Sequence, residues 1–311
     1  MVTPVEIKRF PAGSAQDPQR IKLRNLVVAI CKAAGKEQKI FPALIKAAGK
    51  IIPEFGRLNR THNSDYHRHD MDVHTFELVS RLLDDPAAKP KMSEELVLAA
   101  LLHDIGKPAS ETVENGKSSY VEHAKIGTEM TKNILTGLGI TDEKSRQVTL
   151  EVVRLHMRPV ELINQAAKGN VPENALKNFI KDVVVPLEKL GIDLDTILAF
   201  GRADILASQG PESYTILGVA ENTENSYIKK TDELVKEAKA QIMAFRGVQR
   251  AAAEKAAALK SCPVNSDVLK EVGFKPGPQF GKALKTAVEL ANQGFDKEAI
   301  VARLKELYPI T

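Results

Sequence analysis

Aromatic residues and cysteines are scarce in this sequence. It has no tryptophan, and aromatic residues make up only 5% of its 311 positions. Alanine, leucine, lysine and glutamate are abundant instead, a composition that favours helices over sheets. The two cysteines, Cys31 and Cys262, have no neighbouring Cys or His at ligand spacing. Their placement excludes a disulfide framework and a thiolate metal site.

Long apolar runs are also missing. No run approaches the roughly 18 residues that a membrane-spanning helix needs, so we expect no membrane partner. The N-terminal residues Met1 to Lys8 lack the features of a signal peptide. Together with the scarcity of cysteine, these absences predict a reducing, cytoplasmic location.

Neither sign of charge is in large excess. The sequence has 44 basic and 40 acidic residues, which gives a net charge of +4, and 43% of its residues are hydrophobic. This composition is typical of a globular protein. The charge is compatible with an anionic ligand, but by itself it is no signature of nucleic-acid binding.

Residues 96–108 combine an apolar segment with two adjacent polar residues, His103 and Asp104. Ser93 is suited to cap a helix here, and the apolar residues that follow leave no polar face, so we expect this helix to be buried. Gly106-Lys107-Pro108 is expected to end it. A buried aspartate without a partner is costly, whereas a metal ion would use both the imidazole and the carboxylate. The alternative is a helix end that emerges into solvent with two ordinary polar residues.

Apolar residues recur at helical spacing along most of the chain, and strand signals are scarce. We therefore predict an all-α fold. Asn115-Gly116 is expected to form the turn of a loop or a short hairpin. A helix that starts near Thr141 is expected to run to about His156 and to stop before Pro159.

Several polar residues lie on helix stripes that should point inward. His74, His123, His156 and Asp204 each share a face with apolar residues at helical spacing. A single buried histidine usually has only a structural hydrogen bond. Several polar residues on inward-facing apolar stripes of one domain, however, favour convergence on one site. The predicted site comprises His74, His103, Asp104, His123, His156 and Asp204.

This ligand set contains imidazoles and carboxylates but no thiolate. It suits Mn, Fe, Ni, Co or Zn, with Mg less natural where histidines dominate. If Asp104 bridges, the set is sufficient for two ions, which in such sites lie roughly 3.5–4 Å apart and clamp a phosphoryl group. Lys107 is suited to meet phosphate charge, or is simply a cation at the end of a helix.

These residues resemble a known family. His74, the segment His103-Asp104-Ile105-Gly106-Lys107, and Asp204 are similar to the HD superfamily of metal-dependent phosphohydrolases. Further landmarks look like those of the C-terminal half of bacterial tRNA nucleotidyltransferases and poly(A) polymerases, over roughly residues 40–308. These landmarks are Ile52-Pro53-Glu54-Phe55, Tyr66-His67-Arg68-His69-Asp70, His74-Thr75, Glu122-His123-Ala124-Lys125-Ile126-Gly127, Arg154-Leu155-His156-Met157 and the tail from Val268 to Gly281.

The resemblance implies a domain organisation. We expect a lead-in and helix over residues 1–39, an HD phosphohydrolase domain over 40–222, and a long helix with a helical tail over 223–311. The nucleotidyltransferase domain of those enzymes, with its glycine-rich motif and Asp-x-Asp, is expected to be missing. Asp193-Leu194-Asp195 has the right letters but no preceding glycine-rich turn, and it is interpreted as the start of a helix.

The resemblance also implies hydrolysis of phosphomonoesters or phosphodiesters of nucleotides or RNA ends, such as 2′,3′-cyclic nucleotides. His74, His103, Asp104 and Asp204 would bind a first divalent metal, and His123 and His156 a second. Asp104 and Lys107 would be catalytic, with Asp104 positioning the attacking water. The residues expected to contact the substrate phosphate are Lys107, Arg158 and Arg202.

Two other functions remain open at this stage. In one, the chain is an RNA-binding module, with tRNA as a candidate partner, in which Lys275, Lys282 and Lys285 grip the RNA and the HD site is weak or vestigial. In the other, the metal serves folding only. The sequence does not predict the oligomeric state.

Overall fold

The computed structural model describes residues 18–33, 40–219 and 223–309. Apart from one two-stranded hairpin, the regular elements among its described residues are helices, and the all-α prediction is confirmed. Of the lead-in and helix expected over residues 1–39, residues 1–17 and 34–39 lie outside the described residues. None of the described helices combines the length and the apolar character that crossing a bilayer requires. The chain divides into a unit that ends at Ile242 and a unit that begins at Met243, and each is described by itself.

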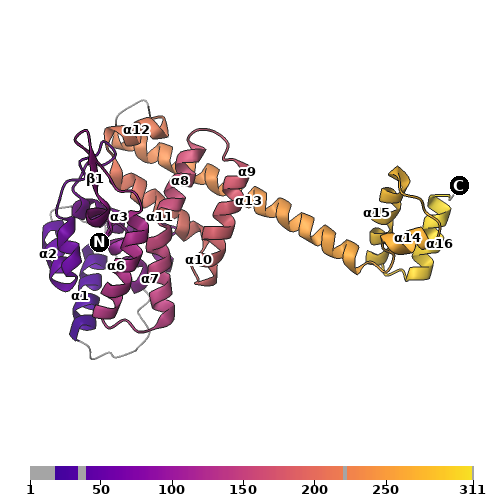
Figure 1. Cartoon of the computed structure of the whole chain (residues 1–311), viewed down its shortest axis with the longest axis horizontal. Coiled ribbons are helices and arrows are strands. Elements are labelled where there is room, and N and C mark those ends of the chain that lie inside the picture. Colours follow the sequence, from indigo (N-terminus) through magenta and orange to yellow (C-terminus); the bar gives the residue numbers. More distant parts are fainter. Residues whose placement is uncertain (1–17, 34–39, 220–222, 310–311) are drawn as a thin grey trace. The chain divides into compact units, whose positions relative to one another are not determined.

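The first unit is a helical assembly with one small hairpin (Figure 1). Helix α11 packs against α3 and α8, and α7 packs against α4 and α6. Its elements are α1 Pro18–Ala33, α2 Phe41–Ile51, η2 Pro53–Leu58, α3 Met71–Asp84, η3 Lys89–Lys91, α4 Glu94–Leu102, α5 Lys107–Ser110, β1 Thr112–Glu114, β2 Lys117–Ser119, α6 His123–Gly137, α7 Glu143–Leu155, α8 Met157–Ala166, α9 Glu173–Phe179, η4 Ile180–Val184, α10 Val185–Lys189, α11 Leu194–Ser208, α12 Pro211–Leu217 and the first part of α13 Glu224–Ser261.

Helix α4 is buried on all sides, as its sequence predicts. Every residue from Leu96 to Leu102 is buried, and the Ser93 side chain accepts a hydrogen bond from the Leu96 amide at 3.3 Å. The helix ends earlier than expected, at Leu102. The chain then turns, and Pro108 lies in the first turn of α5, where its missing amide hydrogen costs nothing.

Helices α7 and α8 meet at His156. The sequence predicts the end of α7 but not α8, which begins at Met157 and carries Pro159 in its first turn. In the first turn of a helix the backbone N–H groups have no intrahelical acceptor, so proline, which lacks this N–H, is tolerated there. A proline can therefore mark the start of a helix as well as its end. His156 consequently lies at the joint between two helices rather than along one of them.

The short hairpin is present. Strands β1 and β2 are antiparallel, and the two residues between them, Asn115 and Gly116, have φ values of 51° and 75°. These values are typical of a type I′ turn, which asparagine and glycine favour. The Ser118 amide donates to the Asn63 carbonyl at 3.0 Å, so the hairpin is attached to the segment that precedes α3.

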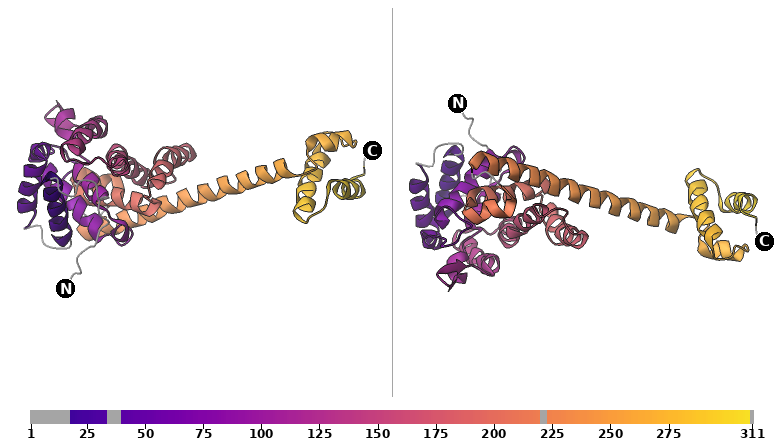
Figure 2. Two further views of the ribbon diagram at one scale, coloured as in Figure 1. Left: turned by 90° about the horizontal axis from the view of Figure 1, so that it is seen from below. Right: turned by 90° about the horizontal axis from the view of Figure 1, so that it is seen from above.

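The second unit has a small core of its own. It contains the last part of α13 and helices α14 Ser266–Glu271, α15 Pro278–Asn292 and α16 Lys297–Leu307. Figure 2 shows the three short helices, in yellow, gathered together. The buried residues of this core include Leu269, Phe274, Ala283, Ile300 and Leu304.

Candidate metal centre

The structure brings the six predicted ligands together in the first unit. They come from α3, the end of α4, the turn that follows it, the start of α6, the joint between α7 and α8, and α11. None of their exposed fractions exceeds 9%. The six are His74, His103, Asp104, His123, His156 and Asp204.

Asp104 lies between two groups of these residues. Its Oδ2 atom is 3.1 Å from Nε2 of His103 and 3.6 Å from Nε2 of His74. Its Oδ1 atom is 3.4 Å from Nε2 of His123 and 3.6 Å from Nε2 of His156. Asp204 belongs to the first group, because its Oδ1 atom is 3.2 Å from Nε2 of His74. One carboxylate therefore presents one oxygen to each group.

Backbone carbonyls fix the orientation of three imidazoles. The Nδ1 atoms of His103, His123 and His156 lie 2.9, 2.8 and 2.7 Å from carbonyl oxygens, each three residues earlier in the chain. A carbonyl only accepts, so Nδ1 carries the proton and Nε2 presents its lone pair to the centre of the site. In metal sites, a hydrogen bond of this kind to the other ring nitrogen orients the histidine toward the ion.

The charge states also suit a cation. Burial lowers the pKa of His123 to about 4, so its imidazole is neutral at pH 7. Burial raises the pKa of Asp104, but neighbouring His103 and Lys107 outweigh it and hold that pKa well below its usual range. Asp204 is likewise ionised, since close contact with His74 outweighs burial and lowers its pKa to about 2.

The donor set fits a divalent metal. It consists of imidazoles and ionised carboxylates, the ligand types that Zn, Mn, Fe, Ni and Co accept. Nε2 of His103 is buried without a hydrogen-bond partner in the part of the chain that the structure describes. Buried polar atoms are seldom left in this way. His74, His103 and Asp204 form one possible metal-binding group, and Asp104, His123 and His156 form another.

A close approach of two glycines sets the distance between Asp104 and His123. A Cβ atom on Gly106 would lie 2.2 Å from the His123 carbonyl oxygen and 2.5 Å from the Gly127 amide nitrogen. Only glycine permits this approach. The start of α6, and with it His123, consequently packs directly on the turn that carries Asp104.

Two histidines that the sequence does not predict as site residues also reach the centre. His62 and His67 stack on one another, with ring centroids 3.7 Å apart, and both contact the Lys107 ammonium group. They come from the irregular segment before α3. The only sequence signal in this segment is its high density of histidines. Without helical spacing, the sequence does not indicate which of these side chains point inward.

The two predicted arginines lie elsewhere. Arg158 is exposed and pairs with Glu161 at 3.1 Å. Arg202 is paired with Asp232 at 2.6 Å and Asp85 at 3.3 Å. Neither lines the cavity beside the site.

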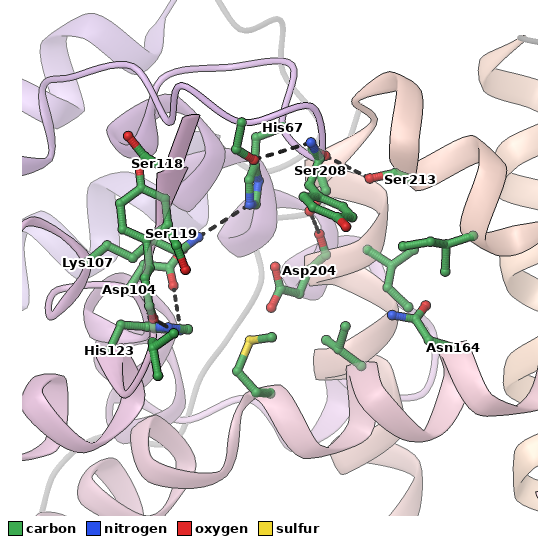
Figure 3. Close-up of a pocket in the computed structure, with 18 of the residues that line it drawn as sticks. His67, Asp104, Lys107, Ser118, Ser119, His123, Asn164, Asp204, Ser208 and Ser213 are labelled. Atoms are coloured by element: carbon green, nitrogen blue, oxygen red, sulfur yellow. Dashed lines mark hydrogen bonds and ion pairs between the residues drawn. The ribbon is translucent and has the colours of Figure 1, made fainter. Parts of the chain in front are cut away.

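A cavity of about 550 Å³ lies against the two groups. Figure 3 shows Asp104, Lys107 and His123 on one side, Asn164 and Ser213 on the other, and Asp204 between them. Apolar side chains and serine hydroxyls make up most of the remaining wall, and Lys107 is the one Lys or Arg that lines it among the described residues. Its volume is in the range of small-molecule sites.

Comparison with known proteins finds a family that resembles most of this site. Residues 73–182 match the HD domain family. This range includes His74, the His103-Asp104 pair, His123 and His156, whereas Asp204 follows it.

Two curated relatives extend the resemblance beyond the HD domain. A CC-adding tRNA nucleotidyltransferase of Thermus thermophilus is 27% identical over 252 residues, which cover 79% of this chain and 46% of the relative. An A-adding tRNA nucleotidyltransferase of Deinococcus radiodurans is 25% identical over 296 residues, 93% of this chain and 58% of the relative. The chain thus spans about half the length of the curated relatives it matches, and the predicted resemblance is confirmed.

Proposed function

We propose that this protein is a metal-dependent phosphohydrolase that cleaves phosphomonoesters or phosphodiesters of nucleotides or RNA ends, such as 2′,3′-cyclic nucleotides. The observation that carries the proposal is the placement of Asp104, with one carboxylate oxygen facing each of two groups of imidazoles. A bridging carboxylate of this kind is typical of two-metal sites that bind a phosphoryl group.

The residues then have separate roles. His74, His103 and Asp204 would hold one divalent ion, and His123 and His156 a second, with Asp104 shared. Such ions, whether Mn, Fe, Ni, Co, Zn or Mg, supply Lewis-acid charge to a phosphoryl oxygen and make a water molecule more acidic. Asp104 accepts hydrogen bonds and orients the water, and the Lys107 ammonium places a further positive charge at the cavity wall.

The cavity favours a small substrate. Its volume of about 550 Å³ accommodates a mononucleotide more readily than a folded RNA. Apolar residues such as Ile216 and Leu217 suit a base, and serine hydroxyls such as Ser208 and Ser213 suit a sugar.

The proposal is tested with a panel of phosphoesters led by 2′,3′-cyclic AMP, assayed with Mn, Ni, Co and Mg in turn. The His103→Ala/Asp104→Ala double variant is the blank, with circular dichroism as a check on its folding. We expect turnover that requires added metal and is absent from the variant. Turnover retained in the variant, or none from folded, metal-loaded protein, contradicts the proposal.

A second candidate function, tRNA binding, is favoured by the names of the two relatives. Lys275, Lys282 and Lys285 are exposed on the second unit, where they would contact an RNA backbone. We expect tRNA affinity that falls steeply with salt and weakens when all three lysines are replaced by alanine. No measurable binding at low salt argues against this function.

A further inference from the structure

The Lys107 ammonium group is buried and surrounded by acceptors. Its side chain is 6% exposed, and Nζ lies 2.7 Å from Oδ2 of Asp104. The other two neighbours are Nε2 of His62 at 3.3 Å and Nε2 of His67 at 3.4 Å. An ammonium group has three N–H bonds and no acceptor. The carboxylate forms an ion pair with the ammonium group, and the two imidazole nitrogens are its hydrogen-bond partners.

The two histidines are built to accept from Lys107. Nδ1 of His62 donates to the His69 carbonyl at 2.8 Å, so Nε2 of His62 carries the lone pair. The Tyr120 hydroxyl donates to the His62 carbonyl and holds that residue's backbone. The two rings are nearly parallel, at 11°, which fixes their planes relative to one another.

We infer that His62 and His67 are positioning residues that hold the Lys107 ammonium as a fixed charge at the wall of the cavity. They touch no reacting atom, and they act through Lys107. One ion pair and two hydrogen bonds hold the Lys107 ammonium group in place, so its contribution to catalysis is that of a preorganised positive charge. The kinetic part of this inference rests on the proposed function, whereas the hydrogen-bonding part does not.

The hydrogen bonds are tested first, without any substrate. In ¹⁵N-lysine-labelled protein, a buried ammonium group held by an ion pair and two imidazole acceptors should exchange its protons slowly enough to give its own NMR signal, assigned by its loss in Lys107→Met. We expect this signal to persist in His67→Gln, which keeps an acceptor near the Nε2 position. It should vanish, or exchange many-fold faster, in His67→Leu and in His62→Leu.

His69→Leu is the matched control. His69 is adjacent in the chain, and its ring interacts with Arg68 rather than Lys107. Its backbone carbonyl, which His62 uses, survives the substitution, so the Lys107 signal should not change. Thermal melts identify any variant that fails to fold. An unchanged signal in folded His62→Leu and His67→Leu overturns the inference.

Kinetics then separate positioning from a merely structural role. A displaced charge lowers kcat by about tenfold to a hundredfold in His67→Leu, with KM changed less than about twofold. In a Lys107→Met background the same substitution should change kcat by less than about twofold, because there is no ammonium left to position. Equal effects in both backgrounds contradict the inference. If no phosphoester is hydrolysed by the wild type, the proposed function fails while the NMR result still decides this inference.

Discussion

Replacement of Asp104 by asparagine is expected to lower kcat/KM for metal-dependent phosphoester hydrolysis by about 10³-fold or more. The amide keeps the shape of the carboxylate but removes the negative charge and one of the two oxygens that face the imidazole groups. Both metal positions lose a ligand at once. The measurements are steady-state kinetics and metal affinity by titration calorimetry.

The same substitution is expected to destabilise the fold. Lys107 lies 2.7 Å from Oδ2 of Asp104 and is buried, so its charge would lose its partner. Removing one partner of a buried ion pair typically costs about 3–5 kcal/mol. The Asp104→Asn/Lys107→Met double variant removes both charges and should recover much of this stability without recovering activity.

These variants separate a catalytic loss from an unfolded protein. Asp182→Asn is the matched control, because Asp182 is exposed and its ion pair with Lys181, at 3.9 Å, lies on the surface. It should keep wild-type activity and stability. Metal-dependent turnover in Asp104→Asn within about tenfold of the wild type would rule out a bridging role for this carboxylate.

Gly106→Ala is expected to lower the free energy of unfolding by about 3 kcal/mol. The new methyl group would lie 2.2 Å from the His123 carbonyl oxygen and 2.9 Å from the Gly127 Cα atom. Both are backbone atoms, so the start of α6 must move as a whole. Chemical denaturation measures the loss, and metal titration should show that the group containing His123 is affected more than the group containing His74.

Gly137→Ala, at the end of α6, provides the control. A Cβ atom at Gly137 would meet nothing within 4 Å, and alanine is the better helix former. We expect its stability to be equal to that of the wild type or slightly higher. A Gly106→Ala variant as stable as Gly137→Ala would show that the close approach of α6 to the Asp104 turn is not required.

The sequence predicts those parts of the fold that depend on local pattern. Helix α4 is recognisable because Leu96 to Leu102 leave it no polar face, and Asp193 is recognisable as the residue that begins α11. Its side chain accepts from the Thr196 amide at 3.0 Å. The candidate ligands are predictable for a related reason. A polar residue such as His74 on an otherwise apolar stripe must point into the core, where it needs a partner.

Other features depend on contacts between distant segments, which periodicity does not reveal. His62 and His67 lie in an irregular segment. They contact Lys107, which is 45 and 40 positions away from them in the sequence. Arg202 pairs with Asp85 and Asp232, and neither partnership can be inferred from the residues around it. The placement of one Asp104 oxygen toward each imidazole group is likewise visible only in three dimensions.

The account is tested most directly by anomalous diffraction from crystals of the protein grown with Mn. We expect two anomalous peaks roughly 3.5–4 Å apart, one among His74, His103 and Asp204 and the other beside His123 and His156. An oxygen of Asp104 should contact each peak. A single peak, or no peak, in crystals grown with saturating Mn would contradict a two-metal centre bridged by Asp104.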